Sequence, residues 1–85
     1  MQTFEYIIKD PIGIHARPAG ELVAEAKKFK STMTLAKGDK SADLVKLFAL
    51  LKLGVKSGET VTIAITGEDE DAAAAAIKAF LAANL

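Results

Sequence analysis

The single histidine of this 85-residue chain stands in the segment Gly13-Ile14-His15-Ala16-Arg17-Pro18, where a turn runs into a helix. A lone histidine is more often structural or simply exposed than functional, but these neighbours favour a function. Pro18 suits the first turn of a helix, because its ring fixes φ and its missing N–H leaves no bond unmade. Free backbone N–H groups in such a turn bind anions, and Arg17 adds a planar guanidinium that matches a phosphoryl group. The segment therefore predicts a nucleophile beside an anion site.

An imidazole is well suited to passing a phosphoryl group from one protein to another. Its ordinary pKa of about 6.5 leaves the ring largely neutral near neutral pH, with a lone pair on one nitrogen. A helix N-terminus disfavours the protonated ring, so that nitrogen stays ready to attack phosphorus. The P–N bond is easily broken, and transfer needs mostly alignment and charge stabilisation, which a partner's pocket would complete. We therefore predict a phosphoryl carrier with His15 as the acceptor.

Other chemistries fit these residues poorly. No G-x-S-x-G, G-x-x-x-x-G-K-[ST] or G-x-G-x-x-G pattern occurs, which argues against a serine hydrolase and a nucleotide site. With one histidine and no cysteine, disulfides and metal sites rich in these residues are excluded, and we expect no metal or cofactor. The first ten residues do not resemble a signal peptide, and no apolar stretch approaches the ~20 residues that span a bilayer. We therefore expect a cytoplasmic protein without membrane insertion.

The elements that must position His15 are predicted by apolar periodicity. Alternating apolar side chains predict four strands, near Thr3–Ile8, Thr32–Ala36, Lys40–Ala42 and Thr60–Thr66. Spacings of three and four, with an acidic run before the last helix, predict helices over Ala16–Phe29, from Leu47 to Gly54, and from Glu68–Asp71 to the C-terminus. Because 85 residues leave room for one core, we expect a single domain over residues 1–85.

The predicted order is β-α-β-β-α-β-α, which defines an α+β protein. An antiparallel sheet with apolar side chains on one face needs a cover, and three one-sided helices supply it. We therefore expect an open-faced two-layer β-sandwich, whose other sheet face, rich in threonine, is open to water.

Charge is unevenly distributed, although the formal net charge is +0. Residues 27–56 hold eight lysines (27, 28, 30, 37, 40, 46, 52 and 56) against Asp39 and Asp43. Two interpretations remain open, a solvated face and a docking surface for acidic partners. Nucleic acid is a weaker third choice, because aromatic residues make up only 6% of the chain.

The sequence resembles the HPr family, the histidine-containing phosphocarriers of the bacterial phosphoenolpyruvate-dependent sugar phosphotransferase system. The resemblance covers the whole chain and rests on the segments Gly13–Ala19, Leu47-Phe48, Leu53-Gly54 and Gly67–Glu70. It implies a sheet of strand order 1-4-2-3 and a stoichiometric carrier instead of an enzyme. Enzyme I would phosphorylate His15 on Nδ1, and the IIA proteins or domains of sugar permeases would receive the group. Because a carrier presents one face to successive partners, we expect a monomer.

The resemblance also implies site roles, residue by residue. His15 would accept the phosphoryl group, Arg17 and the backbone at Ala16 would hold it, and Pro18 would fix the helix start. Partner docking is implied for the first and the short second helix, which points to Ala16, Gly20, Leu47, Phe48 and Leu51, together with Lys46 at the helix start. The apolar residues 47–51 run round a short helix and cannot all face inward. We therefore expect Leu50 in the core and an exposed apolar pair near the phosphate site.

Three positions depart from many relatives. Lys46 stands where they carry a serine that HPr kinase phosphorylates, which argues against the serine-based branch of catabolite control. Ile12 stands where many relatives carry a small polar residue near the histidine. Because isoleucine has no polar side-chain atom, a hydrogen bond from this position to the site is missing. Glu21 lies at i+4 from Arg17, and we hypothesise that it holds the guanidinium away until phosphate arrives.

Three alternatives to the sugar branch stay open. The first is a carrier of the nitrogen-regulation branch. The second is a regulatory paralogue that docks transcription factors without carrying phosphate, and the intact His15 argues against it. The third is a small RNA-binding domain, which needs exposed aromatics on the sheet, whereas Phe4 and Tyr6 are expected in the core.

Overall fold

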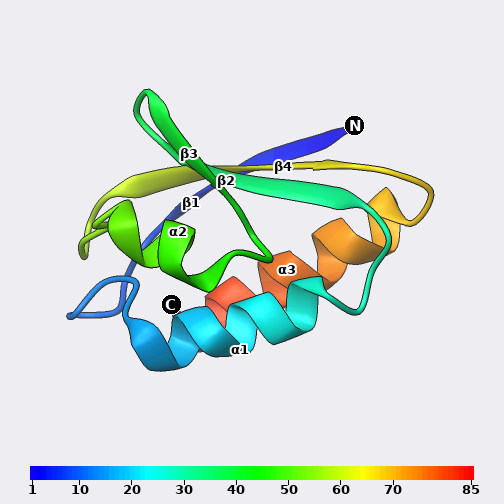
Figure 1. Cartoon of the computed structure of the whole chain (residues 1–85). Coiled ribbons are helices and arrows are strands. Elements are labelled where there is room, and N and C mark those ends of the chain that lie inside the picture. Colours follow the sequence, from blue (N-terminus) through cyan, green and yellow to red (C-terminus); the bar gives the residue numbers. More distant parts are fainter.

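A four-stranded antiparallel sheet forms one layer of the computed structural model, which describes residues 1–85, and three helices form the other layer (Figure 1). The strands are β1 (Gln2–Ile7), β2 (Thr32–Lys37), β3 (Lys40–Asp43) and β4 (Thr60–Thr66). The helices are α1 (Ala16–Ala26), α2 (Leu47–Lys52) and α3 (Glu70–Asn84). The sheet order is β1-β4-β2-β3. The predicted fold class, element order and sheet order are therefore confirmed.

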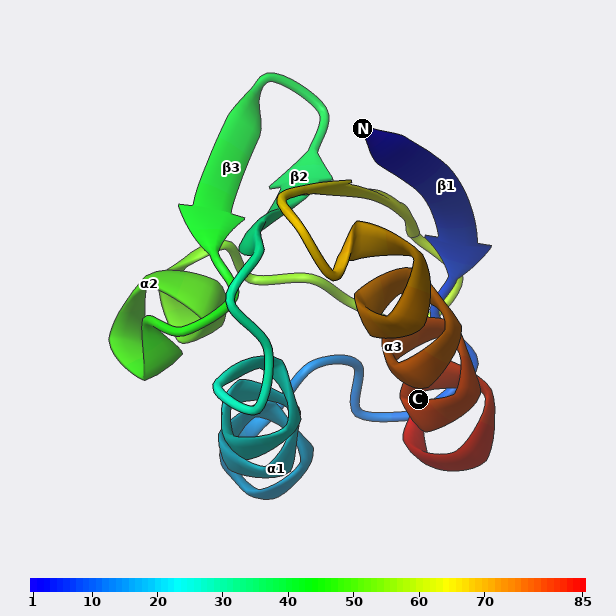
Figure 2. The same cartoon turned by 90° about the vertical axis from the view of Figure 1, so that its right-hand side faces the viewer.

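Alternation along the central strand β4 assigns the two faces of the sheet. Val61, Ile63 and Ile65 are fully buried, because they point toward the helices. Ile63 stands opposite residues of both neighbouring strands, Phe4 in β1 and Leu35 in β2. All three helices lie on the same side of the sheet (Figure 2), and the threonines of β4 and β2 occupy the uncovered face. The burial of alternate apolar residues thus fixes the register of the sheet.

Helix α1 is shorter than its apolar pattern predicts, and the expected end at Phe29 is wrong. The regular helix ends at Ala26, after which the N–H groups of Lys28 and Phe29 donate to carbonyls three residues back, each at 3.2 Å. Such bonds tighten the last turn instead of extending the helix. Phe29 still packs against the core from this turn, so the pattern reported its burial and not its backbone conformation.

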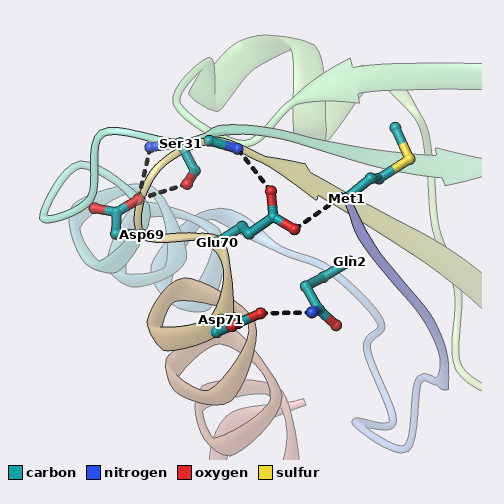
Figure 3. Close-up of polar contacts among 7 residues, drawn as sticks. Met1, Gln2, Ser31, Asp69, Glu70 and Asp71 are labelled. Carbon is teal, nitrogen blue, oxygen red and sulfur yellow. Dashed lines mark hydrogen bonds and ion pairs between the residues drawn. The ribbon is translucent and has the colours of Figure 1, made fainter.

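The start of α3 is tied to two distant segments by carboxylates (Figure 3). Asp69 accepts hydrogen bonds from the hydroxyl and, at 3.0 Å, the N–H of Ser31. Glu70 accepts one from the Gly67 N–H at 3.1 Å and pairs with the amino group of Met1 at 2.7 Å. The hydroxyl of Ser31 is the main cause that lowers the pKa of Asp69, and the amino group of Met1 is the main cause that lowers the pKa of Glu70. These contacts connect the start of α3 to the residues that directly precede β2 and β1.

The aromatic side chains of β1 lie on the helix side of the sheet, as expected. Tyr6 donates a hydrogen bond from its hydroxyl to the Leu81 carbonyl at 3.0 Å. The Lys78 ammonium lies 4.9 Å from the centre of the Phe4 ring. Both aromatic residues are half-buried against the apolar core. None of the three helices has the length and apolar character that crossing a bilayer requires.

Candidate phosphoryl-acceptor site

The loop between β1 and α1 is a tight turn that delivers His15 to the start of a helix. The Asp10 carbonyl accepts a hydrogen bond from the Gly13 N–H, and its carboxylate Oδ1 accepts one from the Ile12 N–H, each at 2.9 Å. Gly13 has φ +87°, a left-handed conformation that glycine adopts without strain. Ile14 is then buried and donates its N–H to the Val55 carbonyl at 3.1 Å. The predicted turn is therefore anchored on the segment that follows α2.

His15 is the N-cap residue of α1. Its backbone is extended, with φ −124° and ψ 175°, and its carbonyl accepts the first helical hydrogen bond, from Ala19, at 2.9 Å. Its side chain does not cap the helix, and 35% of that side chain is exposed. The ring is thus accessible to a partner while its backbone is fixed by the helix.

The first turn of α1 presents free backbone donors beside this ring. The N–H groups of Ala16 and Arg17 have no acceptor in the protein, as expected for the first residues of a helix. Pro18, which has no N–H, is buried in the same turn. The helix dipole places partial positive charge at this end. Two donors and a dipole therefore converge next to His15, as an anion site requires.

Arg17 adds a permanent positive charge two residues after His15 in the chain. Arg17 is exposed, and it makes no ion pair with any acid of the chain. The pairing with Glu21 that the i+4 spacing suggested is absent, because an exposed pair of this kind gains only about 0–1 kcal/mol and both side chains remain solvated. The hypothesis that Glu21 restrains Arg17 is therefore not supported by the structure.

Asp10 is the residue of this site that sequence reasoning missed. Its carboxylate Oδ2 lies 3.6 Å from Nε2 of His15, and its side chain is only 21% exposed. The sequence indicated only a turn at Asp10-Pro11, although aspartate at the start of a turn does signal a side chain folded back onto the following backbone. The tight turn is what brings residue 10 against residue 15.

Helix α2 carries the predicted docking residues, in three different environments. Phe48 is 78% exposed, whereas Leu50 is fully buried, as expected. Leu47 and Leu51 are half-buried and pack against the core, so the expected exposed apolar pair is a single phenylalanine flanked by two partly covered leucines. The reason is that α2 lies on the core, so that among its apolar side chains only Phe48 points fully into solvent. Beyond these leucines, Lys46 is exposed at the N-cap of α2, and Gly20 is half-buried on α1.

Comparison with known proteins places this fold and site in one family. Residues 2–83 match the family described as the PTS HPr component phosphorylation site. The chain is 45% identical over 85 residues to the phosphocarrier protein HPr of Mycoplasma genitalium, covering 99% of this chain and 97% of that relative. The chain therefore belongs to the HPr family, as its sequence motifs indicated.

Solved structures agree with this assignment. A histidine-containing phosphocarrier protein from Mycoplasma superposes with a TM-score of 0.90 at 38% identity, over 93% of this chain and 90% of that one. HPr-C-His from Thermoanaerobacter tengcongensis superposes with a TM-score of 0.93 at 31% identity, over 98% and 93% of the two chains. A structure described as an HPr dimer from the same bacterium gives a TM-score of 0.77 at 31% identity, over 98% and 95%.

Proposed function

We propose that this chain is a phosphocarrier of the phosphoenolpyruvate-dependent sugar phosphotransferase system. It takes a phosphoryl group onto His15 from phosphorylated Enzyme I and passes it to IIA proteins or domains of sugar permeases. The observation that carries the proposal is the accessible imidazole at the N-cap of α1, next to two free N–H groups and two residues before the unpaired Arg17, in a member of the HPr family. The group is transferred stoichiometrically, so the chain acts as a carrier and not as an enzyme.

The transfer step requires no proton movement at the ring. The lone pair of His15 Nδ1 forms the new bond to phosphorus, while the bond from phosphorus to the donor breaks and its electron pair stays with the donor. The N–H groups of Ala16 and Arg17 and the guanidinium of Arg17 stabilise the charge on the phosphoryl oxygens. Pro18 supports this arrangement by holding the first turn of α1 in place. In the onward step a nucleophile of the IIA protein bonds to phosphorus, the P–N bond breaks, and its electron pair returns to Nδ1.

Partners dock on α1 and α2 around the site. Phe48 supplies the apolar contact at the centre, with the exposed parts of Leu47 and Leu51 beside it. Exposed Lys46 adds positive charge that suits acidic partner surfaces, and Ala16 and Gly20 lie on the α1 side of the same surface. A protein that must present this surface to two partners in turn works best as a cytoplasmic monomer, with residues 1–85 acting as one domain.

A relay experiment tests this function. The chain is incubated with phosphoenolpyruvate, Enzyme I and a IIA protein, and phosphate on each component is followed in parallel for wild type and His15→Ala. Wild type should take up label that is labile to acid and stable to alkali and deliver it to IIA, and His15→Ala should do neither. Substituting Enzyme I of the nitrogen branch discriminates the two systems, since faster labelling by that enzyme would assign the chain to nitrogen regulation. Labelling of His15→Ala at the wild-type rate would refute the proposal.

A companion experiment concerns regulation. Because Lys46 has no hydroxyl, HPr kinase with ATP should leave no stable phosphate on this chain. The appearance of phosphoserine, at Ser31, Ser41 or Ser57, would refute this expectation. The oligomeric state is measured at the protein concentration used in these experiments. We expect a monomer, because a dimer would carry two docking surfaces.

A further inference from the structure

Hydrogen bonds fix both the backbone of Asp10 and one oxygen of its carboxylate. Its N–H donates to the carbonyl of Leu85, and its carbonyl accepts from the N–H of Gly13, each at 2.9 Å. Its carboxylate Oδ1 accepts from the N–H of Ile12, also at 2.9 Å. With backbone and side chain both fixed, the second carboxylate oxygen has a defined position in the site.

That second oxygen, Oδ2, lies 3.6 Å from Nε2 of His15. No lysine, arginine or amino group lies within 4.0 Å of the Asp10 carboxylate. His15 is therefore the only basic residue that contacts this carboxylate. The distance is longer than a hydrogen bond. Hydrogen bonds to catalytic groups commonly shorten when charge develops on the ring during the reaction.

We propose that Asp10 is a positioning residue for phosphoryl transfer, an inference that rests on the proposed function. Its Oδ2 favours the ring form with the proton on Nε2, and this form leaves the lone pair on Nδ1. When Nδ1 bonds to phosphorus, the ring gains positive charge while Nε2 keeps its proton, and the carboxylate stabilises that charge. The two oxygens of Asp10 thus have separate tasks, since Oδ1 shapes the turn and Oδ2 selects the nucleophilic nitrogen.

Two substitutions separate these tasks. A structural role and a positioning role of Asp10 predict opposite orders for the transfer rates of the two variants. Asp10→Asn keeps an acceptor for the Ile12 N–H, and its amide NH₂ then faces Nε2 and donates to it, which favours the ring form with the proton on the wrong nitrogen, Nδ1. Asp10→Ala loses the bond to Ile12 but imposes no ring form. A purely structural Asp10 predicts that Asn is harmless and Ala harmful. The positioning role predicts that Asn slows transfer more than Ala does.

The measurement is the rate of phosphoryl uptake from phosphorylated Enzyme I, together with nitrogen NMR of the imidazole in the unphosphorylated protein. We expect about a tenfold lower rate for Asp10→Asn and about a threefold lower rate for Asp10→Ala. The NMR signals should show the proton on Nε2 in wild type and a shift toward Nδ1 in Asp10→Asn. Asp39→Asn, which alters an exposed hairpin residue, is the matched control and should change neither quantity.

The outcomes also separate this inference from the proposed function. If Asp10→Asn takes up phosphate at the wild-type rate with an unchanged ring signal, the role of Asp10 is wrong while the carrier function stands. If Asp10→Ala is slower than Asp10→Asn, Asp10 acts only through the turn, and the inference is overturned. If wild type itself takes up no phosphate, the proposed function fails first.

Discussion

Gly13 and Val55 approach so closely that a β-carbon on Gly13 would overlap the Val55 carbonyl oxygen, and it would stand 2.8 Å from the Cα of Lys56. The same glycine has φ +87°, a conformation that other residues adopt only with strain. The contact joins the loop that carries His15 to the segment after α2. The loop that carries His15 is therefore joined to the segment after α2 by a direct backbone contact.

Gly13→Ala should destabilise the protein by at least about 2 kcal/mol, because left-handed strain and backbone overlap add. It should also slow phosphoryl uptake, because His15 moves with its loop. Denaturant unfolding measures the stability change. Gly20→Ala is the control, since nothing lies within 4 Å of its added carbon and alanine should stabilise α1 by about 0.5–1 kcal/mol. Equal stability of Gly13→Ala and wild type would contradict the packing described.

Arg17→Lys should slow phosphoryl uptake about tenfold and Arg17→Gln about a hundredfold. Lysine keeps the charge but loses the planar fork, whereas glutamine loses both. The stability of each variant should stay within about 0.5 kcal/mol of wild type, because Arg17 is exposed and unpaired. Rapid-mixing kinetics with phosphorylated Enzyme I measures the rates. Lys27→Gln, which removes a positive charge at the C-terminal end of α1, is the charge-matched control. Uptake by Arg17→Gln at the control rate would remove Arg17 from the phosphate site.

Phe48→Ala should weaken docking of Enzyme I and IIA by about tenfold and leave stability within about 0.5 kcal/mol, because the ring is 78% exposed. Leu50→Ala, two residues away, should instead lower the free energy of unfolding by about 2–5 kcal/mol, since Leu50 is fully buried. Binding titrations and urea unfolding measure the two quantities on both variants. If Phe48→Ala unfolds as easily as Leu50→Ala while docking normally, α2 serves the core and not the partners.

Acid should destabilise the protein through three carboxylates with lowered pKa values. The Lys56 N–H is the main cause for Glu59, the Ser31 hydroxyl for Asp69, and the Met1 amino group for Glu70. The unfolded chain takes up protons near the ordinary pKa values of 4.5 for Glu59 and Glu70 and 3.8 for Asp69, while the folded chain resists. Their stabilisation is therefore complete above about pH 5 and is lost as pH falls through the lowered folded values.

The test of this acid effect is urea unfolding at a series of pH values from about 6 to about 2. Ser31→Ala should reduce the loss of stability on acidification, because it removes the main cause of the Asp69 shift. Ser41→Ala, at an exposed position of β3, should leave the acid dependence unchanged. A Ser31→Ala profile parallel to that of wild type would show that the hydroxyl does not lower the pKa of Asp69.

Much of the fold was predictable from periodicity, because side-chain burial repeats with the period of each element. Val61, Ile63 and Ile65 identified β4, and the segment from Gly13 to Pro18 identified the N-terminus of α1. The strand order came from the family resemblance and not from the pattern, since alternation says nothing about which strands are neighbours. The end of α1 was predicted wrongly at Phe29. A buried residue in a tight turn can continue the apolar spacing of the preceding helix although the helix has already ended.

The site was predictable only where its parts are close in sequence. His15, Ala16, Arg17 and Pro18 form one local unit, and local capping rules are enough to assemble it. The contact between Asp10 and His15 depends on the backbone conformation of the turn that lies between them. The packing of Gly13 on Val55 depends on the tertiary fold. Neither has a periodic signal in the sequence.

The most direct test of the central claim is to locate the phosphoryl group after incubation with phosphoenolpyruvate and Enzyme I. Phosphorus–nitrogen NMR correlation on the labelled chain identifies the atom that carries it. The account predicts one phosphoryl group, bonded to Nδ1 of His15 and absent from His15→Ala. A group on Nε2, or on any residue other than His15, would contradict it.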